Sequence, residues 1–272
     1  MEQFLDFFGK LPNIGKVGWI VVCMSIFWIL EGMWPLAGFR YRKWQHAFPN
    51  LVLLTTTILI NALFGVLTAG LFLWMDQHQF GLLYLVDFPW WMELIMALLL
   101  LDLLAQYLVH YLLHKVKFMW RFHMVHHSDT AVDVTTGTRH HPGDYMMREM
   151  FSLVAILVSG MPFAFYVFYR LTTILFTYFT HANLNIPGWL DKAISYIFIS
   201  PHMHKFHHHF ERPWTDTNFG NIFSIWDRLF GTFVYDDPRK IRYGLDVLQD
   251  STSDQLGYQL KLPFDPTIKT DR

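Results

Sequence analysis

Long apolar runs separated by short polar connections organise the first part of the chain. Three of these runs, over residues 17–36, 51–74 and 90–113, predict membrane-spanning helices. Each run is close to the roughly 20 helical residues that a hydrocarbon core requires. The second run contains no charged residue, and the first is interrupted only by Glu31. The pattern therefore predicts three full membrane spans.

A fourth apolar region covers residues 151–180 and is broken in its middle by Gly160 and Pro162. Proline removes a backbone donor and clashes with the preceding helical turn, so a break is expected there. We interpret the region as a hairpin of two short helices that dips into the membrane and returns. A single kinked span is the alternative, but it would place the histidine clusters described below on opposite sides of the membrane.

The basic residues in the connections predict the orientation. The connection after the first span carries Arg40, Arg42 and Lys43, whereas the connection after the second carries Asp76 and Asp87 and no lysine or arginine. Because cytoplasmic loops are enriched in lysine and arginine, the first connection is predicted to be cytoplasmic. The third span then returns to the cytoplasm, where the polar region from residue 201 onward forms a cap rich in histidine.

The composition agrees with an all-α integral membrane protein. Hydrophobic residues make up 53% of the 272 residues and charged residues 16%, against about 25% charged residues in an ordinary soluble protein. The net charge of −1 gives no basic field, which argues against nucleic acid as a partner. The single cysteine, Cys23, excludes an internal disulfide and a thiolate metal site. We expect N-terminal membrane helices over residues 1–89 and a catalytic region over residues 90–272.

Histidine is the residue type that the sequence singles out. The chain has 15 histidines, and most of them fall in two segments, HYLLHKVKFMWRFHMVHH at 110–127 and HMHKFHHHF at 202–210. The spacings i, i+4 and i, i+3, i+4 within these segments place imidazoles on one face of a helix. The predicted metal ligands from the two segments are His110, His114, His123, His126, His127, His204, His207 and His208, with His141 and His181 as additions from the residues between them.

This pattern indicates a shared metal site, because neutral imidazole is the commonest side-chain metal ligand. Eight ligands suffice for two ions at about four each. One HxxxH or HxxHH is often only interfacial polarity or a surface contact, whereas HxxxH followed by two copies of HxxHH is hard to obtain by chance. Imidazoles without thiolate suit iron, zinc, copper or nickel, and the chemistry alone leaves iron and zinc both open.

The other histidines carry less information. His46 and His78 lie in connections far from the clusters, and we assign them no metal. His140, His202 and His209 each neighbour a stronger candidate, and the sequence leaves open whether they touch metal, contact a ligand or face solvent.

Asp102 lies inside the third span, eight residues before His110. At the rise of an α-helix the two residues are about 12 Å apart, which is too far for one metal ion. An ionisable residue at membrane depth suggests a function. Asp102 would orient Gln106, Tyr107 or a water molecule near the site, and a buried structural hydrogen bond is an equal alternative.

Beyond the histidines, several segments resemble the sterol desaturase/fatty acid hydroxylase superfamily of membrane di-iron enzymes. LDLLAQYLVHYLLH, TGTRHHPGDY, THAN and NFGNIFSIWDRLFGTF are each similar to a motif of that family, and the resemblance covers about residues 90–265. The chain departs from the family at Asp144, where glutamate is usual, and at His209, a third consecutive histidine in the last box.

The resemblance implies that two iron ions, or zinc in a purified sample, are bound by these histidines. It implies that the enzyme uses O₂ and two external electrons to hydroxylate or desaturate a lipid C–H bond. We favour hydroxylation as the simpler chemistry. A lipid substrate and a separate electron donor (a reductase, ferredoxin or cytochrome) follow from the same resemblance.

Two other functions are weighed against this one. A zinc-stabilised membrane protein that binds a lipid without redox activity would use the same histidines. A metal transporter would need ionisable residues in several spans, and the uncharged run at 51–74 disfavours it. The sequence does not specify which lipid is the substrate, which protein donates electrons or how many chains assemble.

We predict that changing any one of His126, His127, His207 or His208 to alanine abolishes lipid turnover, because each change removes a predicted metal ligand. The variants should still insert into membranes. Product analysis on lipid extracts and membrane fractionation measure the two properties. Full activity in the His207→Ala variant would refute the assigned role.

Overall fold

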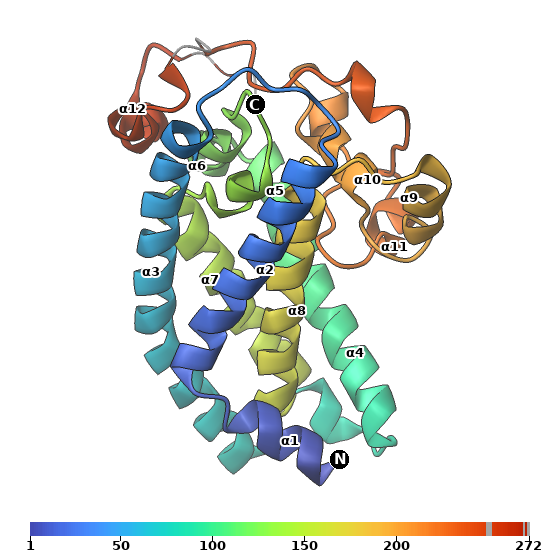
Figure 1. The fold of residues 1–272 in the computed structure, drawn as a ribbon. Helices are drawn as coiled ribbons and strands as arrows, with labels where there is room; N and C mark the ends of the chain where they lie inside the picture. Colours follow the sequence, from blue (N-terminus) through green and yellow to red (C-terminus); the bar gives the residue numbers. More distant parts are fainter. Residues whose placement is uncertain (249–251, 269, 271–272) are drawn as a thin grey trace.

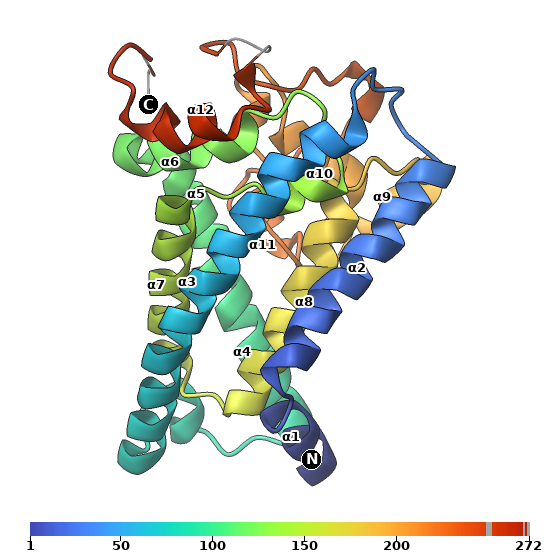
Figure 2. The same ribbon diagram turned by 60° about the vertical axis from the view of Figure 1, so that its left-hand side comes forward.

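Long helices stand side by side and carry a cap of short helices at one end (Figures 1 and 2). The computed structural model describes residues 1–248, 252–268 and 270. Within these residues the only β interactions are two isolated bridges, Pro35 with Leu184 and Phe198 with Phe223. The all-α class predicted from the sequence is confirmed.

Three helical units are long and apolar enough to cross a membrane, as predicted. The first two are α2 (Asn13–Met33) and α3 (Lys43–His78). The third is continuous through α4 (Trp90–Asp102), the π-helical turn η2 (Leu103–Leu108) and α5 (Val109–Lys115). Large apolar side chains remain exposed along these units, as expected for a surface that a membrane covers. These features are those of a multi-pass membrane protein.

The fourth apolar region is a hairpin, as predicted, but its helices are not short. α7 (Pro142–Ser159) has 18 residues and α8 (Phe163–His181) has 19. Each is therefore about 27 Å long or slightly more, close to the thickness of a hydrocarbon core. α7 begins well before the apolar region because the His141 side chain accepts the Gly143 amide and caps it. Proline also suits the first helical position, so polar residues extend this helix.

The turn of the hairpin rests against the connection that follows α3. Gly160 has a φ of 67° and Gly81 a φ of 119°, values that glycine adopts readily and other residues rarely. A Cβ built on Gly160 would lie 2.7 Å from the Phe80 carbonyl oxygen and 2.8 Å from the Gly81 Cα. The hairpin therefore reaches the end of the bundle opposite the cap.

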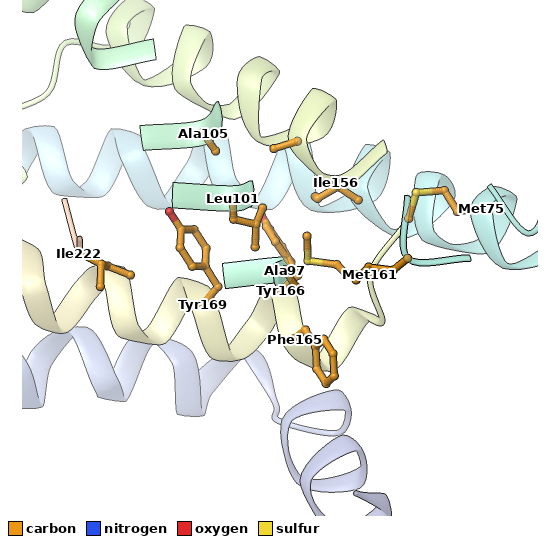
Figure 3. Close-up of a cluster of buried hydrophobic side chains, with 12 residues drawn as sticks. Met75, Ala97, Leu101, Ala105, Ile156, Met161, Phe165, Tyr166, Tyr169 and Ile222 are labelled. Atoms are coloured by element: carbon orange, nitrogen blue, oxygen red, sulfur yellow. The ribbon is translucent and has the colours of Figure 1, made fainter. Parts of the chain in front are cut away.

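A cluster of buried apolar side chains joins the helices of the bundle (Figure 3). Leu101 comes from the third span, Ile156 from α7 and Phe165 from α8. Ile222, which belongs to a loop of the cap, enters the same cluster. The N-terminal helix α1 (Glu2–Gly9) covers α8 through aromatic contacts. This shared core fixes the cap relative to the spans.

The cap contains the two helices that carry most of the clustered histidines, α6 (Lys117–His127) and α10 (Pro201–His207). Its other elements are η3 (Val134–Thr138), α9 (Gly188–Ile194), η4 (Trp214–Asp216), α11 (Ile225–Leu229), η5 (Pro238–Lys240), α12 (Leu256–Lys261) and η7 (Leu262–Phe264). Between α6 and α10 the chain leaves the cap through α7 and returns to it through α8. Both histidine segments consequently lie at the same end of the bundle.

We predict that Gly160→Ala lowers the midpoint of thermal unfolding in detergent. The left-handed conformation costs a residue with a Cβ about 1–2 kcal/mol, and the new methyl group has no room at the turn. Gly70→Ala in α3 is the matched control, because nothing lies within 4 Å of its Cβ position and alanine is favoured inside a helix. Equal midpoints for the two variants would contradict this account of the turn.

Candidate metal centre

Nine histidines of the cap and of the adjoining helix ends converge into two buried groups. The first group contains His110, His114, His123, His127 and His207, and the second contains His126, His181, His204 and His208. Within each group, one ring nitrogen from every residue lies within 4.8 Å of the others. The structure thus brings together nine of the ten residues that the sequence predicts as ligands.

Each HxxHH segment contributes to both groups. In α6, His123 and His127 belong to the first group and His126 to the second. In α10, His207 belongs to the first group and His204 to the second. The His126 and His127 rings are 5.4 Å apart, so the two groups are adjacent and share the same two helices.

Local features orient the helices that carry these residues. Val116 takes an extended conformation, with φ −96° and ψ 114°, and separates α5 from α6 so that the chain turns there. Ser200 caps α10, and its hydroxyl accepts the Met203 amide at 3.3 Å. Capping of this kind defines where a short helix begins. The sequence thereby sets the start of both histidine helices.

A buried lysine fastens α10 to the end of α8. The Lys205 ammonium donates to the carbonyl oxygens of His181 at 3.1 Å and Ala182 at 2.8 Å. These carbonyls lie at the C-terminal end of a helix, which favours a cation. Burial lowers the pKa of Lys205 to about 8. The interaction holds the second histidine segment against the residue that ends the hairpin.

Hydrogen bonds to the outer ring nitrogens fix the direction of the imidazoles. His110 Nδ1 lies 2.8 Å from the Phe219 carbonyl oxygen, and His207 Nδ1 lies 2.8 Å from the Thr217 carbonyl oxygen. A carbonyl oxygen only accepts, so each Nδ1 carries the hydrogen and each Nε2 presents a lone pair. This arrangement of outer partners is typical of histidines that bind metal.

In the second group three inner nitrogens approach a fourth that has a single lone pair. His181 Nδ1 lies 2.7 Å from the Thr177 carbonyl oxygen, so its Nε2 carries a lone pair. That Nε2 lies 3.2, 3.0 and 3.2 Å from the Nε2 atoms of His126, His204 and His208. One lone pair accepts a single well-aligned hydrogen, and the other contacts are repulsive without a cation. The group therefore fits a metal ion.

The first group shows the same conflict. His110 Nε2 and His123 Nε2 are 3.1 Å apart, although the Asp144 carboxylate, 3.4 Å from His123 Nδ1, favours the hydrogen on that outer nitrogen. Nε2 of His207 and both ring nitrogens of His127 are buried and have no hydrogen-bond partner in the described part of the chain. Buried polar atoms without partners are costly. A bound metal ion would satisfy them.

Burial keeps these imidazoles neutral, which is the state that binds metal. It lowers the pKa of His123 to about 4, although the Asp144 carboxylate acts in the opposite direction. Burial also lowers the pKa of His126, His127 and His208 well below the usual value, and neighbouring imidazoles add to this effect. The rings are therefore in the neutral form at neutral pH.

Asp102 supports the site from within the third span. Its carboxylate accepts the amides of Ile222 and Phe223 at 3.2 Å, the Trp226 indole N–H at 3.1 Å and the Tyr169 hydroxyl at 3.4 Å. These bonds hold the loop that also supplies the carbonyl oxygens of Thr217 and Phe219, which face His207 and His110. The π-helical turn η2 lies directly after Asp102, and such turns are frequent at functional sites.

Asp227 also holds this loop. Its Oδ1 accepts the Phe219 amide at 2.7 Å, and its Oδ2 accepts the Gly220 amide at 3.0 Å. A Cβ on Gly220 would approach the same Oδ2 to 3.0 Å. The segment from Thr217 to Asp227, which the sequence marks from Asn218 onward only through a family resemblance, is thus a clamped loop that orients candidate ligands.

The structure places His141 outside both groups. Its Nδ1 accepts an amide at the start of α7, and its Nε2 lies 3.3 Å from the Leu260 carbonyl oxygen. His140 stacks on His126 with ring centroids 4.7 Å apart, and its Nδ1 lies 2.8 Å from the Asp144 carboxylate. His140 therefore adjoins a candidate ligand without belonging to either group.

The other histidines also lie outside the two groups. His202 lies 3.6 Å from Asp191, and His209 accepts the Glu211 amide. His46 and His78 belong to α3 and not to connections as predicted. His46 is buried in a separate group with Asp129 and the exposed Asp254, and His78 stacks on Trp74.

Three ionisable residues inside the hairpin are not among the residues that the sequence analysis selects. They are Arg148 and Glu149 on α7 and Arg170 on α8, and Glu149 pairs with Arg170 at 2.7 Å. All three line a cavity of about 150 Å³ that also reaches the histidines. The sequence signal used for Asp102, an ionisable residue inside an apolar run, applies to Arg170. Arg148 and Glu149 precede the apolar run and carry no such signal.

Comparisons with known proteins match the region that carries this site. The fatty acid hydroxylase family matches residues 94–232. The chain is 31% identical to ornithine lipid hydroxylase OlsE of Rhizobium tropici over 122 residues, which are 44% of this chain and 35% of that protein. It is 29% identical to alkylglycerol monooxygenase of Homo sapiens over 182 residues, 66% of this chain and 38% of that protein.

The alkylglycerol monooxygenase of Danio rerio gives a similar match, 29% identity over 181 residues that cover 66% of this chain and 38% of the relative. The chain thus spans little more than a third of the length of these curated relatives. No solved structure matches the chain.

We predict that Asp102→Asn lowers the metal affinity of the site by about 10–100-fold, the usual effect of removing a residue that orients metal ligands. An amide side chain accepts at one atom only, so the loop held by Asp102 loses part of its anchorage. Metal content after dialysis against graded chelator measures the effect. Asp76→Asn, at an exposed position near the end of α3, is the control. Wild-type metal retention by Asp102→Asn would contradict this role.

Proposed function

The chain belongs to the fatty acid hydroxylase family, and from this premise we propose that it is a membrane-bound lipid hydroxylase. The observation that carries the proposal is the pair of adjacent, buried imidazole groups at the cap end of the membrane helices. The relatives named above are a lipid hydroxylase and a monooxygenase, so both names describe oxygen-inserting enzymes. A lipid from the membrane would be the substrate.

We assign one iron ion to each histidine group. An imidazole donor set without thiolate suits iron, and the outer hydrogen bonds hold the rings in the orientation that a metal needs. When bound, the iron pair would supply O₂ activation with two electrons and two protons, so that one oxygen atom enters a lipid C–H bond and the other leaves as water. The electrons would come from a separate protein, such as a reductase, a ferredoxin or a cytochrome.

The residues of the chain would orient the ligands and exclude water. The carbonyl oxygens of Thr217 and Phe219 fix the ring tautomers, and Asp102 and Asp227 hold the loop that presents them. The buried position of the histidines keeps bulk water away, which limits side reactions. We propose residues 90–272 as the catalytic region and residues 1–89 as helices that complete its membrane-facing walls.

We place the cap on the cytoplasmic side. The connection between α2 and α3 lies at the cap end (Figure 1). It carries Arg40 and Arg42, and Lys43 begins α3, whereas the end of α3 and the connection after it contain Asp76 and Asp87 and no lysine or arginine. Positively charged loops favour the cytoplasm. A soluble electron donor would then reach the cap directly.

Purified protein loaded with iron under anaerobic conditions should bind two iron ions per chain. With a reductant, ¹⁸O₂ and a membrane lipid extract, we expect O₂ consumption and a hydroxylated lipid that contains one ¹⁸O atom, measured by an oxygen electrode and mass spectrometry. The same protein loaded with zinc is the control and should consume no O₂.

Other results would change the assignment. Zinc retained in stoichiometric amount under anaerobic iron loading, with no O₂ consumption on any lipid, would instead support a zinc-stabilised lipid-binding protein. An alkene product without ¹⁸O would indicate a desaturase.

A further inference from the structure

The cavity of about 150 Å³ connects the histidine groups with the interior of the membrane helices. Four candidate ligands line it, namely His110, His126, His181 and His204. The other lining residues come from α2, α3, η2, η3, α7 and α8, together with His140 and the clamped loop. A molecule in this cavity would contact the metal site and the membrane helices at the same time.

The wall formed by the membrane helices combines apolar and polar side chains. The apolar ones are Ile20, Leu54, Ile58 and Ile174, and the polar ones are Asn61, Tyr145, Arg148, Glu149 and Arg170. Polar side chains among membrane helices are costly and usually mark a functional site. The middle of a hydrocarbon chain would gain nothing from the polar part of this wall.

Four of these side chains form a network with balanced charge. The Arg170 guanidinium donates to the Glu149 carboxylate at 2.7 Å and to Asn61 Oδ1 and the Tyr145 hydroxyl at 2.8 Å. The Asn61 amide also donates to the Tyr145 hydroxyl at 2.7 Å. Because this hydroxyl accepts two bonds, its own hydrogen is left to donate. The network therefore presents one oriented O–H donor.

Further unsatisfied groups line the same cavity. The Arg148 Nε donates to Asp144 at 3.1 Å, and its two Nη atoms have no acceptor in the described part of the chain. Thr57 Oγ1 and Asn221 Oδ1 are buried, and neither has a partner among the described residues. The cavity thus offers donors at Arg148 and Tyr145 and an acceptor at Asn221. A hydroxyl group matches both, because it donates one hydrogen and accepts through two lone pairs.

The polar wall begins next to the metal site. His140 stacks on the candidate ligand His126 with ring centroids 4.7 Å apart, and its ring centroid lies 6.3 Å from that of Tyr145. A group bound at Tyr145 would therefore be a short distance from the second histidine group. The carbon presented to the metal must then be a near neighbour of that bound group.

We propose that this wall, formed by Asn61, Tyr145, Arg148, Glu149 and Arg170, binds an uncharged oxygen group of the lipid, with a hydroxyl as the best match. Binding there directs oxidation to a carbon a few bonds from that oxygen rather than to the middle of the chain. Both arginines are paired with carboxylates, Arg148 with Asp144 and Arg170 with Glu149, so the wall favours a neutral group over an anion. The inference rests on the proposed hydroxylase function.

The first experiment uses the iron-loaded protein in nanodiscs with a chemical reductant and four probes: octadecane, octadecanol, the octadecyl ether of glycerol and octadecanoate. We expect the alcohol and the ether to be oxidised close to their oxygen atoms. Octadecane should react at about one tenth of their rate or more slowly, since a site built to bind a hydroxyl rejects an analogue that lacks it. Mass spectrometry locates the new oxygen. Mid-chain oxidation, or a preference for octadecane or octadecanoate, would overturn the proposal.

The second experiment changes one atom of the wall. Tyr145→Phe should raise the KM for the glycerol ether about 10-fold, the effect of losing one buried hydrogen bond, and should spread the oxidation over more distant carbons. Its iron content should stay at the wild-type value, which a merely structural role would not predict. Tyr196→Phe, at an exposed position of the cap, is the matched control and should behave as wild type.

The two proposals fail in different ways. A wild-type KM and product position in the Tyr145→Phe variant would overturn the subsite and leave the hydroxylase function intact. No oxidation of any probe by the iron-loaded wild type would overturn the proposed function and the subsite with it.

Discussion

The structure depends on one electrostatic constraint, the meeting of several imidazole lone pairs in a space without water. Several of the rings, those of His110, His181 and His207 among them, are held from outside by a carbonyl oxygen, which leaves a lone pair and no hydrogen on the inner nitrogen. At separations of 3.0–3.2 Å such nitrogens repel one another. Only a cation resolves the conflict, and the surrounding architecture keeps the rings in place for it.

That requirement explains the less regular parts of the fold. The hairpin must bring the chain back to the end from which it left, or the two histidine segments would not meet. The loop after α10 must be rigid, because it supplies carbonyl oxygens that orient the rings, and Asp102 and Asp227 anchor it at different amides. Ile222 also ties this loop to the apolar core of the bundle. The order of the cap therefore depends on the packing of the membrane helices.

The sequence predicts those features that depend on local composition and spacing. Apolar runs predict the spans, Gly160 and Pro162 predict the hairpin turn, and histidine spacing selects nine residues that come together. The sequence does not predict how these residues divide between the two groups, since that depends on the angle between α6 and α10. The sequence also does not predict the polar start of α7, which a capping bond sets, or the network around Arg170, which depends on partners distant in the chain.

The division of each HxxHH segment has a consequence for the assembly of the centre. Since α6 and α10 each give rings to both groups, neither group is a self-contained chelate that fills while the other stays unformed. An ion in one group restrains both helices and thereby lowers the entropy cost of arranging the other. Two ions bound here would therefore form a single cooperative unit, and the pitch of two short helices, rather than flexible loops, would set their separation.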